Sequence, residues 1–374
     1  MKKTLHTQPD YAARESAYLA DYAMHSIDTG GREQAETEHP YRGPFQRDRD
    51  RILHSAAFRR LSGKTQVFTG NMGDYHRTRL THTMEVASIA RTIGRTLQLN
   101  EDLIEAMALL HDIGHPPFGH AGEDTLNDCL ESEGGFSHNR FALTLVTELE
   151  RPYPTFPGLN LTREVLNGQV GRAMKQEVKQ YPLLEAQVVD IADSITYDAH
   201  DVDDAVKLNL LSIQQLEDVP LISSCLQRIR DRFGVLKGKA LRRTLVHELI
   251  DCQVSNVLAF SRSAIARHQF TSAVAAQQVE RTVTTGTKMT EEKRALETFL
   301  YHRVYRHEQV VAGRHQAQQQ LLEAFDILTT SPERLPIKFQ DRMQTTGIRR
   351  AAADYLAGMT DQFFSRQHQV LSQS

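Results

Sequence analysis

Cysteine is scarce in this chain of 374 residues, and its three copies are far apart in the sequence. Cys129, Cys225 and Cys252 are odd in number and form no CxxC pair. Because disulfide frameworks and structural zinc sites need paired or closely spaced cysteines, the sequence argues against both. This cysteine usage favours a reducing compartment.

Long apolar runs are missing as well. No stretch of about 18 apolar residues occurs, so the sequence predicts no membrane span. The N-terminal residues MKKTLHTQPDY contain two lysines but lack the apolar segment of a signal peptide. With 40% hydrophobic residues and a net charge of −3, the composition is that of a soluble globular protein, and we expect it to be cytoplasmic.

Patterns typical of strands are also lacking, since no βαβ alternation, hairpin series or internal repeat is present. Residues 1–45 mix polar, glycine and proline residues without sustained periodicity, and we expect an N-terminal arm with a short helix near 12–24. The remaining sequence is helical in pattern almost throughout. We therefore predict an all-α fold with a core at 46–211 and a C-terminal helical region at 212–374 packed on it.

Two consecutive helices can be placed in the core. Apolar residues recur at helical spacing from Thr81 to Leu97, and Asn100 is a suitable N-cap for the next helix. That helix must end near Gly114, because Pro116 and Pro117 cannot continue it. Further helical segments are predicted at 141–149, 184–197 and 203–211.

The most informative stretch is HDIGHPPFGH at 111–120, which places four residues of metal-binding type at the end of the second helix and in the turn beyond it. His82 lies on the preceding helix, and Asp193 lies far downstream in VVDIADSITY. With His111 and Asp112 they offer two imidazoles and two carboxylates, which neutralise a divalent ion and leave positions for water and a phosphate oxygen. Each residue taken singly could be an ordinary hydrogen-bonded helix residue, and Asp190 competes with Asp193.

Residues near these four admit two interpretations each. Tyr197, one helical turn after Asp193, shares its helix face and borders the pocket, or is a core tyrosine. Arg79, three residues before His82, contacts an anion beside the metal, or forms a surface salt bridge. His120 and Glu123 form an oriented imidazole suited to acid–base catalysis, or Glu123 is an acid at the start of a helix.

Arginine is concentrated between residues 42 and 95. Ten Arg and one Lys face four acidic residues there, a local excess of seven positive charges. The guanidinium group offers a rigid fork of donors that suits phosphate oxygens. The stretch is therefore a candidate for phosphate or nucleic-acid contacts, and a solvated basic surface is the alternative.

Several segments resemble the deoxyguanosine triphosphate triphosphohydrolase family of the HD-domain superfamily. They are RTRLTHTME at 77–85, HDIGHPPFGHAGE at 111–123, GGFSHN at 134–139 and VVDIADSITYDAHDVDDA at 188–205. The similarity runs from about residue 47 to beyond 210, with a weaker echo in DYLAGMTDQF at 354–363. The resemblance implies an all-α HD-domain core with helical elaborations at both ends.

The resemblance also implies roles for individual residues. His120 is similar to a catalytic histidine of the family, and Glu123 to the acid that orients it. The implied metal ligands are His82, His111, Asp112 and Asp193. The implied substrate contacts are Arg79, His115, His138, Tyr197 and Gln66.

The activity that the resemblance implies is hydrolysis of dGTP or several deoxynucleoside triphosphates to deoxynucleoside and tripolyphosphate. It requires a divalent ion, which is Mn, Mg or another first-row transition metal. The family also implies a homo-oligomer, either hexamer or tetramer, and leaves room for a nucleotide or single-stranded DNA effector. Two alternatives stay open: an HD-type nucleotide phosphatase or phosphodiesterase with another substrate, and a nucleic-acid-binding regulatory protein on the same fold.

Overall fold

The computed structural model describes residues 11–66, 77–174 and 180–373. Within these ranges the chain is built from α-helices with short 3₁₀ and π-helical turns, so the all-α prediction is confirmed. β structure there is limited to two isolated bridges, Arg32–Thr162 and Thr65–Thr78.

The helices of the first half are α1 (Tyr11–Tyr18), α2 (Pro44–Leu53), α3 (Ala56–Arg60), α4 (Arg79–Thr96), α5 (Glu101–Leu110), α6 (His120–Cys129), α7 (His138–Thr144), α8 (Arg163–Ala173) and α9 (Leu184–Lys207). Those of the second half are α10 (Ile213–Leu216), α11 (Pro220–Phe233), α12 (Gly238–His268), α13 (Ala273–Ala276), α14 (Thr287–Leu300), α15 (Glu308–Thr330), α16 (Ile337–Thr346), α17 (Ile348–Ala357) and α18 (Asp361–Ser372).

Helix α5 begins and ends where its sequence predicts. The Asn100 side chain accepts a hydrogen bond from the Leu103 amide at 3.2 Å, which satisfies one of the free N–H groups at the helix start. The helix ends at Leu110, and the segment up to Gly119 forms the turn that leads into α6. His111 and its neighbours therefore lie at a helix end, where the backbone can turn their side chains in different directions.

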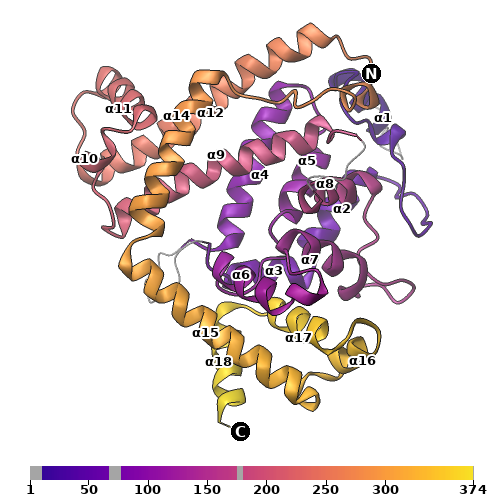
Figure 1. The fold of residues 1–374 in the computed structure, drawn as a ribbon. Coiled ribbons are helices and arrows are strands. Elements are labelled where there is room, and N and C mark those ends of the chain that lie inside the picture. The colour runs from indigo at the N-terminus through magenta and orange to yellow at the C-terminus, as the bar shows by residue number, and fades with distance from the viewer. Residues whose placement is uncertain (1–10, 67–76, 175–179, 374) are drawn as a thin grey trace, which may run out of the picture.

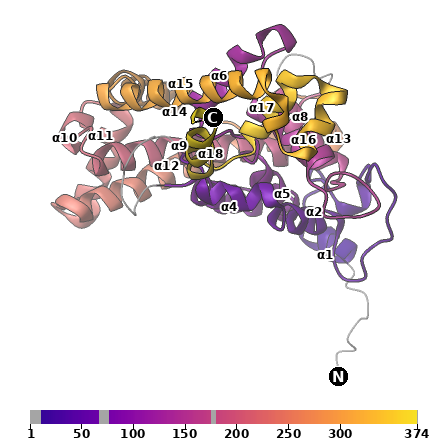
Figure 2. The ribbon, with the colours of Figure 1, turned by 90° about the horizontal axis from the view of Figure 1, so that it is seen from below.

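Helix α9 differs from its prediction, because residues 184–207 form one helix rather than two. The acidic residues after Tyr197 do not end it, since Ala199, Val202 and Ala205 continue a buried face. This helix packs against α4 and α12, and it passes between α4 and α14 (Figures 1 and 2). Because α9 is long, it carries residues of the site near its centre, and its last turns contact helices of the C-terminal half.

The C-terminal helices complete the main core. Val257, Phe325 and Phe364 belong to the same buried cluster as Ile104 of α5. Helix α15 packs on α6, and α17 packs on both (Figure 1). A second buried cluster joins the end of α9 to α11, α12 and α14.

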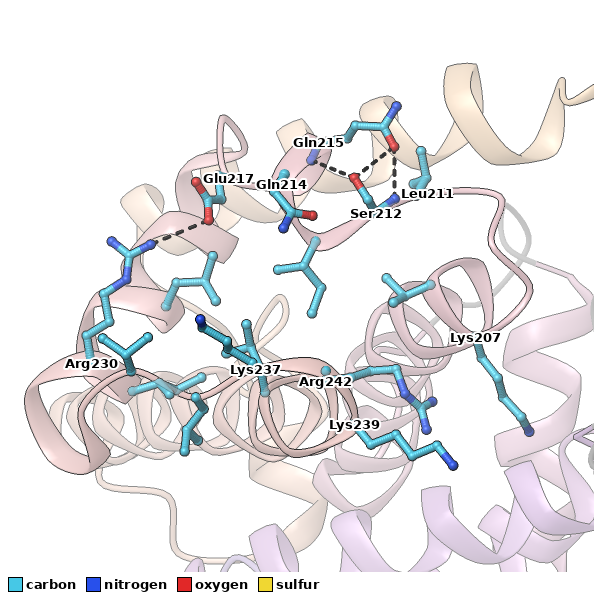
Figure 3. Close-up of a pocket in the computed structure, with 18 of the residues that line it drawn as sticks. Lys207, Leu211, Ser212, Gln214, Gln215, Glu217, Arg230, Lys237, Lys239 and Arg242 are labelled. Atoms are coloured by element: carbon cyan, nitrogen blue, oxygen red, sulfur yellow. Dashed lines mark hydrogen bonds and ion pairs between the residues drawn. The ribbon is translucent and has the colours of Figure 1, made fainter.

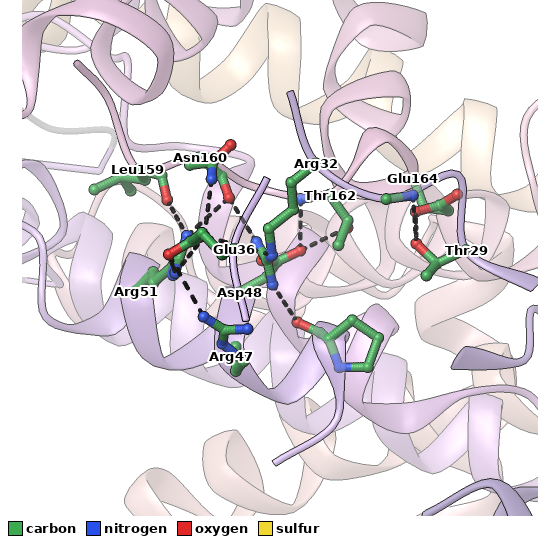
Figure 4. A network of polar contacts seen from close by, with 12 residues as sticks. Thr29, Arg32, Glu36, Arg47, Asp48, Arg51, Leu159, Asn160, Thr162 and Glu164 are labelled. Atoms are coloured by element: carbon green, nitrogen blue, oxygen red, sulfur yellow. Dashed lines mark hydrogen bonds and ion pairs between the residues drawn. The ribbon is translucent and has the colours of Figure 1, made fainter. Parts of the chain in front are cut away.

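The N-terminal arm is fastened to the core by a buried polar network (Figure 4). Arg32 pairs with Asp48, whose carboxylate also accepts the Thr162 amide at 2.9 Å. Arg51 pairs with Glu36 of the arm at 2.7 Å. Because these charges are compensated within the network, the arm lies against α2 and the residues that precede α8 without leaving a charge buried alone.

The cysteines are free thiols, although Cys225 and Cys252 come within 3.7 Å of each other between α11 and α12. None of the helices in the described ranges combines the length and apolar character that crossing a bilayer requires.

Candidate active site

Three helices bring His82, His111 and Asp193 together. His82 lies in the first turn of α4, His111 at the end of α5, and Asp193 in α9. The Nε2 atoms of His82 and His111 lie 3.1 and 3.6 Å from Asp193 Oδ1. One donor atom from each residue falls within 4.8 Å of the others, a spacing that a single metal ion could bridge.

Asp112 connects this cluster to the turn and to Arg79. Its Oδ1 lies 3.5 Å from His111 Nε2 and 3.2 Å from His115 Nε2, while Oδ2 accepts a hydrogen bond from Arg79 Nη1 at 2.7 Å. Burial would raise the pKa of Asp112, but its interactions with the imidazoles of His111 and His115 and with the Arg79 guanidinium outweigh this effect and hold that pKa well below its usual range. Asp112 is therefore an anion, and Arg79, 1% exposed, forms a buried ion pair rather than a surface one.

The protonation of His111 fits a metal ligand. Its Nδ1 donates to the carbonyl of Ala108 at 2.6 Å, which leaves Nε2 with a lone pair. Nε2 is buried, and no described residue offers it a hydrogen bond. Burial lowers the pKa of His111, so the neutral form is favoured. A buried acceptor without a donor costs free energy, and a cation held between Nε2 and the two carboxylates would remove that cost.

A second cluster lies in the turn and at the start of α6. The rings of His115 and His138 stack with centroids 3.7 Å apart. Glu123 accepts hydrogen bonds from His138 Nδ1 at 2.7 Å and His120 Nδ1 at 3.2 Å. Burial would raise the pKa of Glu123, but these two hydrogen bonds outweigh it and lower that pKa. Glu123 lies in the first turn of α6 and also orients two imidazoles, so both interpretations of this residue apply together.

The two clusters are continuous. Asp112 groups with His115 and His138, and His115 groups with His120 and Glu123, each within the spacing of 4.8 Å. The histidines thus form a row that runs from the three-helix cluster to the start of α6. A row of imidazoles and Arg79 beside a candidate cation could neutralise several phosphate oxygens.

Tyr197 and Gln66 border this row. The Tyr197 ring lies edge-on to His82 with centroids 6.5 Å apart, and its hydroxyl accepts a hydrogen bond from Tyr305 at 2.7 Å. Gln66 is 4% exposed, and its backbone carbonyl accepts from Arg79 Nη2 at 3.3 Å. Its side-chain oxygen is buried without a hydrogen bond from any described residue, so it is available to a ligand.

Comparison with known proteins agrees with this geometry. The HD domain family model matches residues 79–198, and the phosphohydrolase-associated domain model matches residues 283–370. A deoxyguanosinetriphosphate triphosphohydrolase-like protein of Ralstonia pickettii is 40% identical, covering 94% of this chain and 93% of its own. The corresponding protein of Brucella anthropi is 42% identical, covering 94% and 95%.

The chain belongs to the deoxyguanosinetriphosphate triphosphohydrolase-like family of HD-domain proteins. It is a metal-dependent phosphohydrolase. Among solved structures, a hypothetical protein from Aquifex aeolicus aligns over 73% of this phosphohydrolase and 71% of its own chain, with 17% identity and a TM-score of 0.32.

Sequence reasoning missed two residues beside the cluster of this phosphohydrolase. Arg172 of α8 contacts Asp190 at 2.7 Å and Asp193 at 3.4 Å. Asp190 is therefore paired with an arginine, while Asp193 approaches the histidines. His200 lies two helical turns after Asp193, and its Nδ1 is 3.2 Å from His82 Nδ1. That spacing along α9 could have revealed His200, whereas nothing in the sequence linked Arg172 to the site.

Most of the positive charge of the arginine-rich stretch at 42–95 is compensated by carboxylates in this phosphohydrolase. Nine of its ten arginines form ion pairs with carboxylates, and the tenth, Arg59, donates to the carbonyl of His54. The local excess of positive charge in the sequence is therefore largely neutralised by acidic residues from other segments. A continuous phosphate-binding surface along this stretch is not supported.

Cations gather instead around a cavity of about 860 Å³ at the far end of α9 (Figure 3). Five basic side chains and one acidic side chain line it: Lys207, Arg230, Lys237, Lys239, Arg242 and Glu217. Its apolar wall comes from aliphatic residues such as Leu226 and Ile229 of α11. None of the candidate residues of the histidine row lines this cavity.

Proposed function

We propose that the protein hydrolyses deoxynucleoside triphosphates to deoxynucleoside and tripolyphosphate. The observation that carries the proposal is the continuous row of imidazoles from the three-helix cluster to His120, with Arg79 beside it. A monophosphate would need only part of this row. The names of the relatives, about 40% identical over nearly the whole chain, support the same class of substrate.

His82, His111, Asp112 and Asp193 would hold the divalent ion in this proposal. When bound, such an ion polarises a phosphoryl oxygen and makes a nearby water more acidic. Mn, Mg or another first-row metal suits a set of two imidazoles and two carboxylates. Water attacks the α-phosphorus, the bond to the 5′ oxygen breaks, and the triphosphate leaves intact.

The other residues of the row bind the phosphates and move the proton. Arg79 stabilises the charge that develops on the phosphate oxygens through its own positive charge, and His115 and His138 do so through hydrogen bonds. His120 is the general acid or base, because Glu123 occupies its Nδ1 and leaves Nε2 toward the substrate. Tyr197 packs on the deoxyribose, and Gln66 offers its side-chain oxygen, which has no hydrogen bond from a described residue, to the sugar.

Product analysis tests this proposal. The purified protein is incubated with each of the four deoxynucleoside triphosphates and Mn²⁺ or Mg²⁺, and tripolyphosphate is resolved from pyrophosphate and orthophosphate. We expect tripolyphosphate and deoxynucleoside in equal amounts. Release of orthophosphate or pyrophosphate alone would reject the proposal in favour of another HD-type phosphatase or phosphodiesterase. An Asp112→Ala variant controls for contaminating activity.

A second, regulatory function is favoured by the basic cavity of Figure 3. We propose that a nucleotide or single-stranded DNA effector binds there through its phosphates, rather than along residues 42–95. Arg242 of the cavity also pairs with Asp203, which contacts Arg77 at 3.5 Å just before α4. This chain of ion pairs gives the cavity a physical connection to the start of the helix that carries His82.

Filter binding over a salt titration tests this second function, with single-stranded DNA and a nucleoside triphosphate as separate probes. Replacing Lys237 and Lys239 by Gln should weaken binding of the true effector and reduce its salt dependence. Arg59→Gln serves as the control in the arginine-rich stretch. Equal effects of the two changes would contradict the assignment to the cavity.

The homo-oligomer implied by the family is part of the same proposal, and a hexamer or tetramer is expected. Light scattering coupled to gel filtration measures the mass directly. A monomer that is active at nanomolar concentration would contradict it.

A further inference from the structure

The motif DYLAGMTDQF at 354–363 takes no part in the proposed chemistry, yet it contacts the turn that carries His115. It forms the end of α17 and the start of α18, within the phosphohydrolase-associated region. Among the described residues, the carbonyl of Ala357 and the carboxylate of Asp361 accept hydrogen bonds from segments of the site. The C-terminal end of the chain thus reaches the centre of the HD domain.

Lys64 makes the first of these contacts. Its side chain is 2% exposed, and Nζ donates to the carbonyl of Ala357 at 2.9 Å and to the carbonyl of His115. Its own carbonyl accepts the amide of Arg79 at 2.9 Å. A single buried residue therefore ties the end of α17 to the turn and to the start of α4.

Asp361 makes the second contact, and each of its carboxylate oxygens serves a different segment. Oδ2 accepts the Thr65 amide at 2.9 Å, and Oδ1 accepts the Phe118 amide at 3.0 Å. One turn further along α18, Phe364 packs edge-on against the Phe118 ring with centroids 5.2 Å apart. Helix α18 thus holds both the backbone and the side chain of Phe118.

Phe118 needs such support because of its backbone conformation. Its φ is 64°, in the left-handed region that residues with a Cβ rarely adopt. Gly119 follows with φ 59°, and a Cβ there would lie 2.8 Å from Nη2 of Arg79. The turn therefore passes directly against Arg79, and His120 begins the next helix. A change in the conformation of Phe118 would move His115 and His120 relative to Arg79.

We propose that Asp361 and Lys64 are positioning residues for the phosphohydrolase reaction. In the described part of the chain, the side chains of both residues make their hydrogen bonds to backbone groups and not to the side chains of the candidate metal ligands. They fix the turn 115–119 so that His115 and His120 stand at the correct distance from Arg79. The phosphohydrolase-associated region then completes the site, rather than only covering the core. This inference rests on the proposed function, because the loss of activity that we expect on displacing the turn comes from the step in which His120 moves a proton.

A matched pair of variants tests the inference. Asp361→Asn keeps the size of the side chain but replaces one acceptor oxygen by a donor, so it can no longer serve both amides. Asp354 belongs to the same motif, and its Oδ2 lies 2.6 Å from Nε of Arg342 in a buried ion pair. Asp354→Asn therefore breaks a buried ion pair of the motif that does not involve the turn. If the motif acted only through stability, the two variants would behave alike.

For Asp361→Asn we expect kcat for the preferred deoxynucleoside triphosphate to fall by about 10- to 100-fold, since small displacements of reacting groups cost about that much. The KM and the Mn²⁺ concentration for half activation should change less than about threefold. Asp361→Glu, which retains two acceptor oxygens, should recover part of kcat. Asp354→Asn should lower Tm with kcat within about threefold of the unchanged protein. The inference would be overturned if kcat fell equally in Asp354→Asn and Asp361→Asn. It would also be overturned if Asp361→Asn left kcat unchanged.

Hydrogen exchange separates this outcome from a failure of the proposed function. In Asp361→Asn and Lys64→Met, peptides spanning 112–122 should exchange faster than in the unchanged protein, while Asp354→Asn should leave them protected. This readout needs no substrate. If the unchanged protein hydrolyses no deoxynucleoside triphosphate but the exchange differs as expected, the proposed function fails and the positioning contact stands. If exchange at 112–122 is the same in all four proteins, the positioning contact itself is rejected.

Discussion

Arg79 Nη1 and Asp112 Oδ2 lie 2.7 Å apart in the interior of the protein, with the two residues 1% and 5% exposed. The same carboxylate faces His111 and His115 through its other oxygen. An arginine that could bind phosphate and an aspartate that could bind a metal therefore share one hydrogen bond. Removing either partner leaves a buried charge without compensation.

The first prediction follows from this pair. Arg79→Gln should destabilise the metal-free protein by about 3 kcal/mol, because Asp112 loses its buried partner. It should also lower kcat by about 10²- to 10³-fold through the lost phosphate contact. Urea unfolding and steady-state kinetics measure the two effects. Arg91→Gln on the same helix is the control, since Arg91 is 40% exposed and its loss should cost no more than about 0.5 kcal/mol.

The second prediction concerns the two aspartates of α9. Asp193 lies 3.1 Å from His82 Nε2, whereas Asp190 faces Arg172. Asp193→Asn should weaken Mn²⁺ binding at least about tenfold more than Asp190→Asn, which acts only through Arg172. Calorimetric titration and the metal content after dialysis measure this. Addition of Mn²⁺ should raise Tm in the unchanged protein and in Asp190→Asn, but not in Asp193→Asn. The reverse ranking would assign the ligand to Asp190.

The third prediction separates His120 from the acid that orients it. His120→Ala should lower kcat by about 10²- to 10⁴-fold with unchanged metal content, as expected for loss of a general acid or base. Glu123→Gln should give a smaller loss of kcat but also raise KM, because Glu123 holds both His120 and His138. His54→Ala, at an exposed position in α2's C-cap, is the control. A His120→Ala variant with full activity would remove this residue from the mechanism.

The fourth prediction is a dependence of stability on pH. Burial raises the pKa of Asp198 from 3.8 to about 6, although Lys293 beside it acts in the opposite direction. Because the folded state binds this proton more tightly, the contribution to stability is complete below about pH 3.8 and is lost as the pH rises through about 6. The free energy of unfolding of the unchanged protein, relative to Asp198→Asn, should therefore fall between pH 4 and 7.

The size of this effect follows from the pKa shift of Asp198. A rise of about two units corresponds to at most about 3 kcal/mol. Urea unfolding at pH 4, 5, 6 and 7 gives the free energy of unfolding of the unchanged protein and of Asp198→Asn. Because the other carboxylates titrate in both proteins, their contribution cancels in the difference between the two free energies. A difference that stays constant over this range would show that Asp198 keeps an ordinary pKa in the folded protein.

The fold class and the helix ends near the site could be read from the sequence because both depend on local physics. Asn100 caps α5 through an amide three residues away, and Pro116 excludes a continuous helix after Gly114. The end of α9 could not be read in this way. Its acidic residues resemble a helix end, and only the partners that bury Ala199 and Val202 show that the helix continues.

The sequence by itself determined the all-α architecture, the family and the set of candidate residues, since those depend on short-range periodicity and on motifs of a few residues. Only the tertiary structure decided which groups face one another. Arg172 meets Asp193, His200 meets His82, and Asp361 reaches Phe118 from a position 243 residues away. The physical reason is that such contacts depend on how helices pack, and packing is set by the whole core rather than by any local segment.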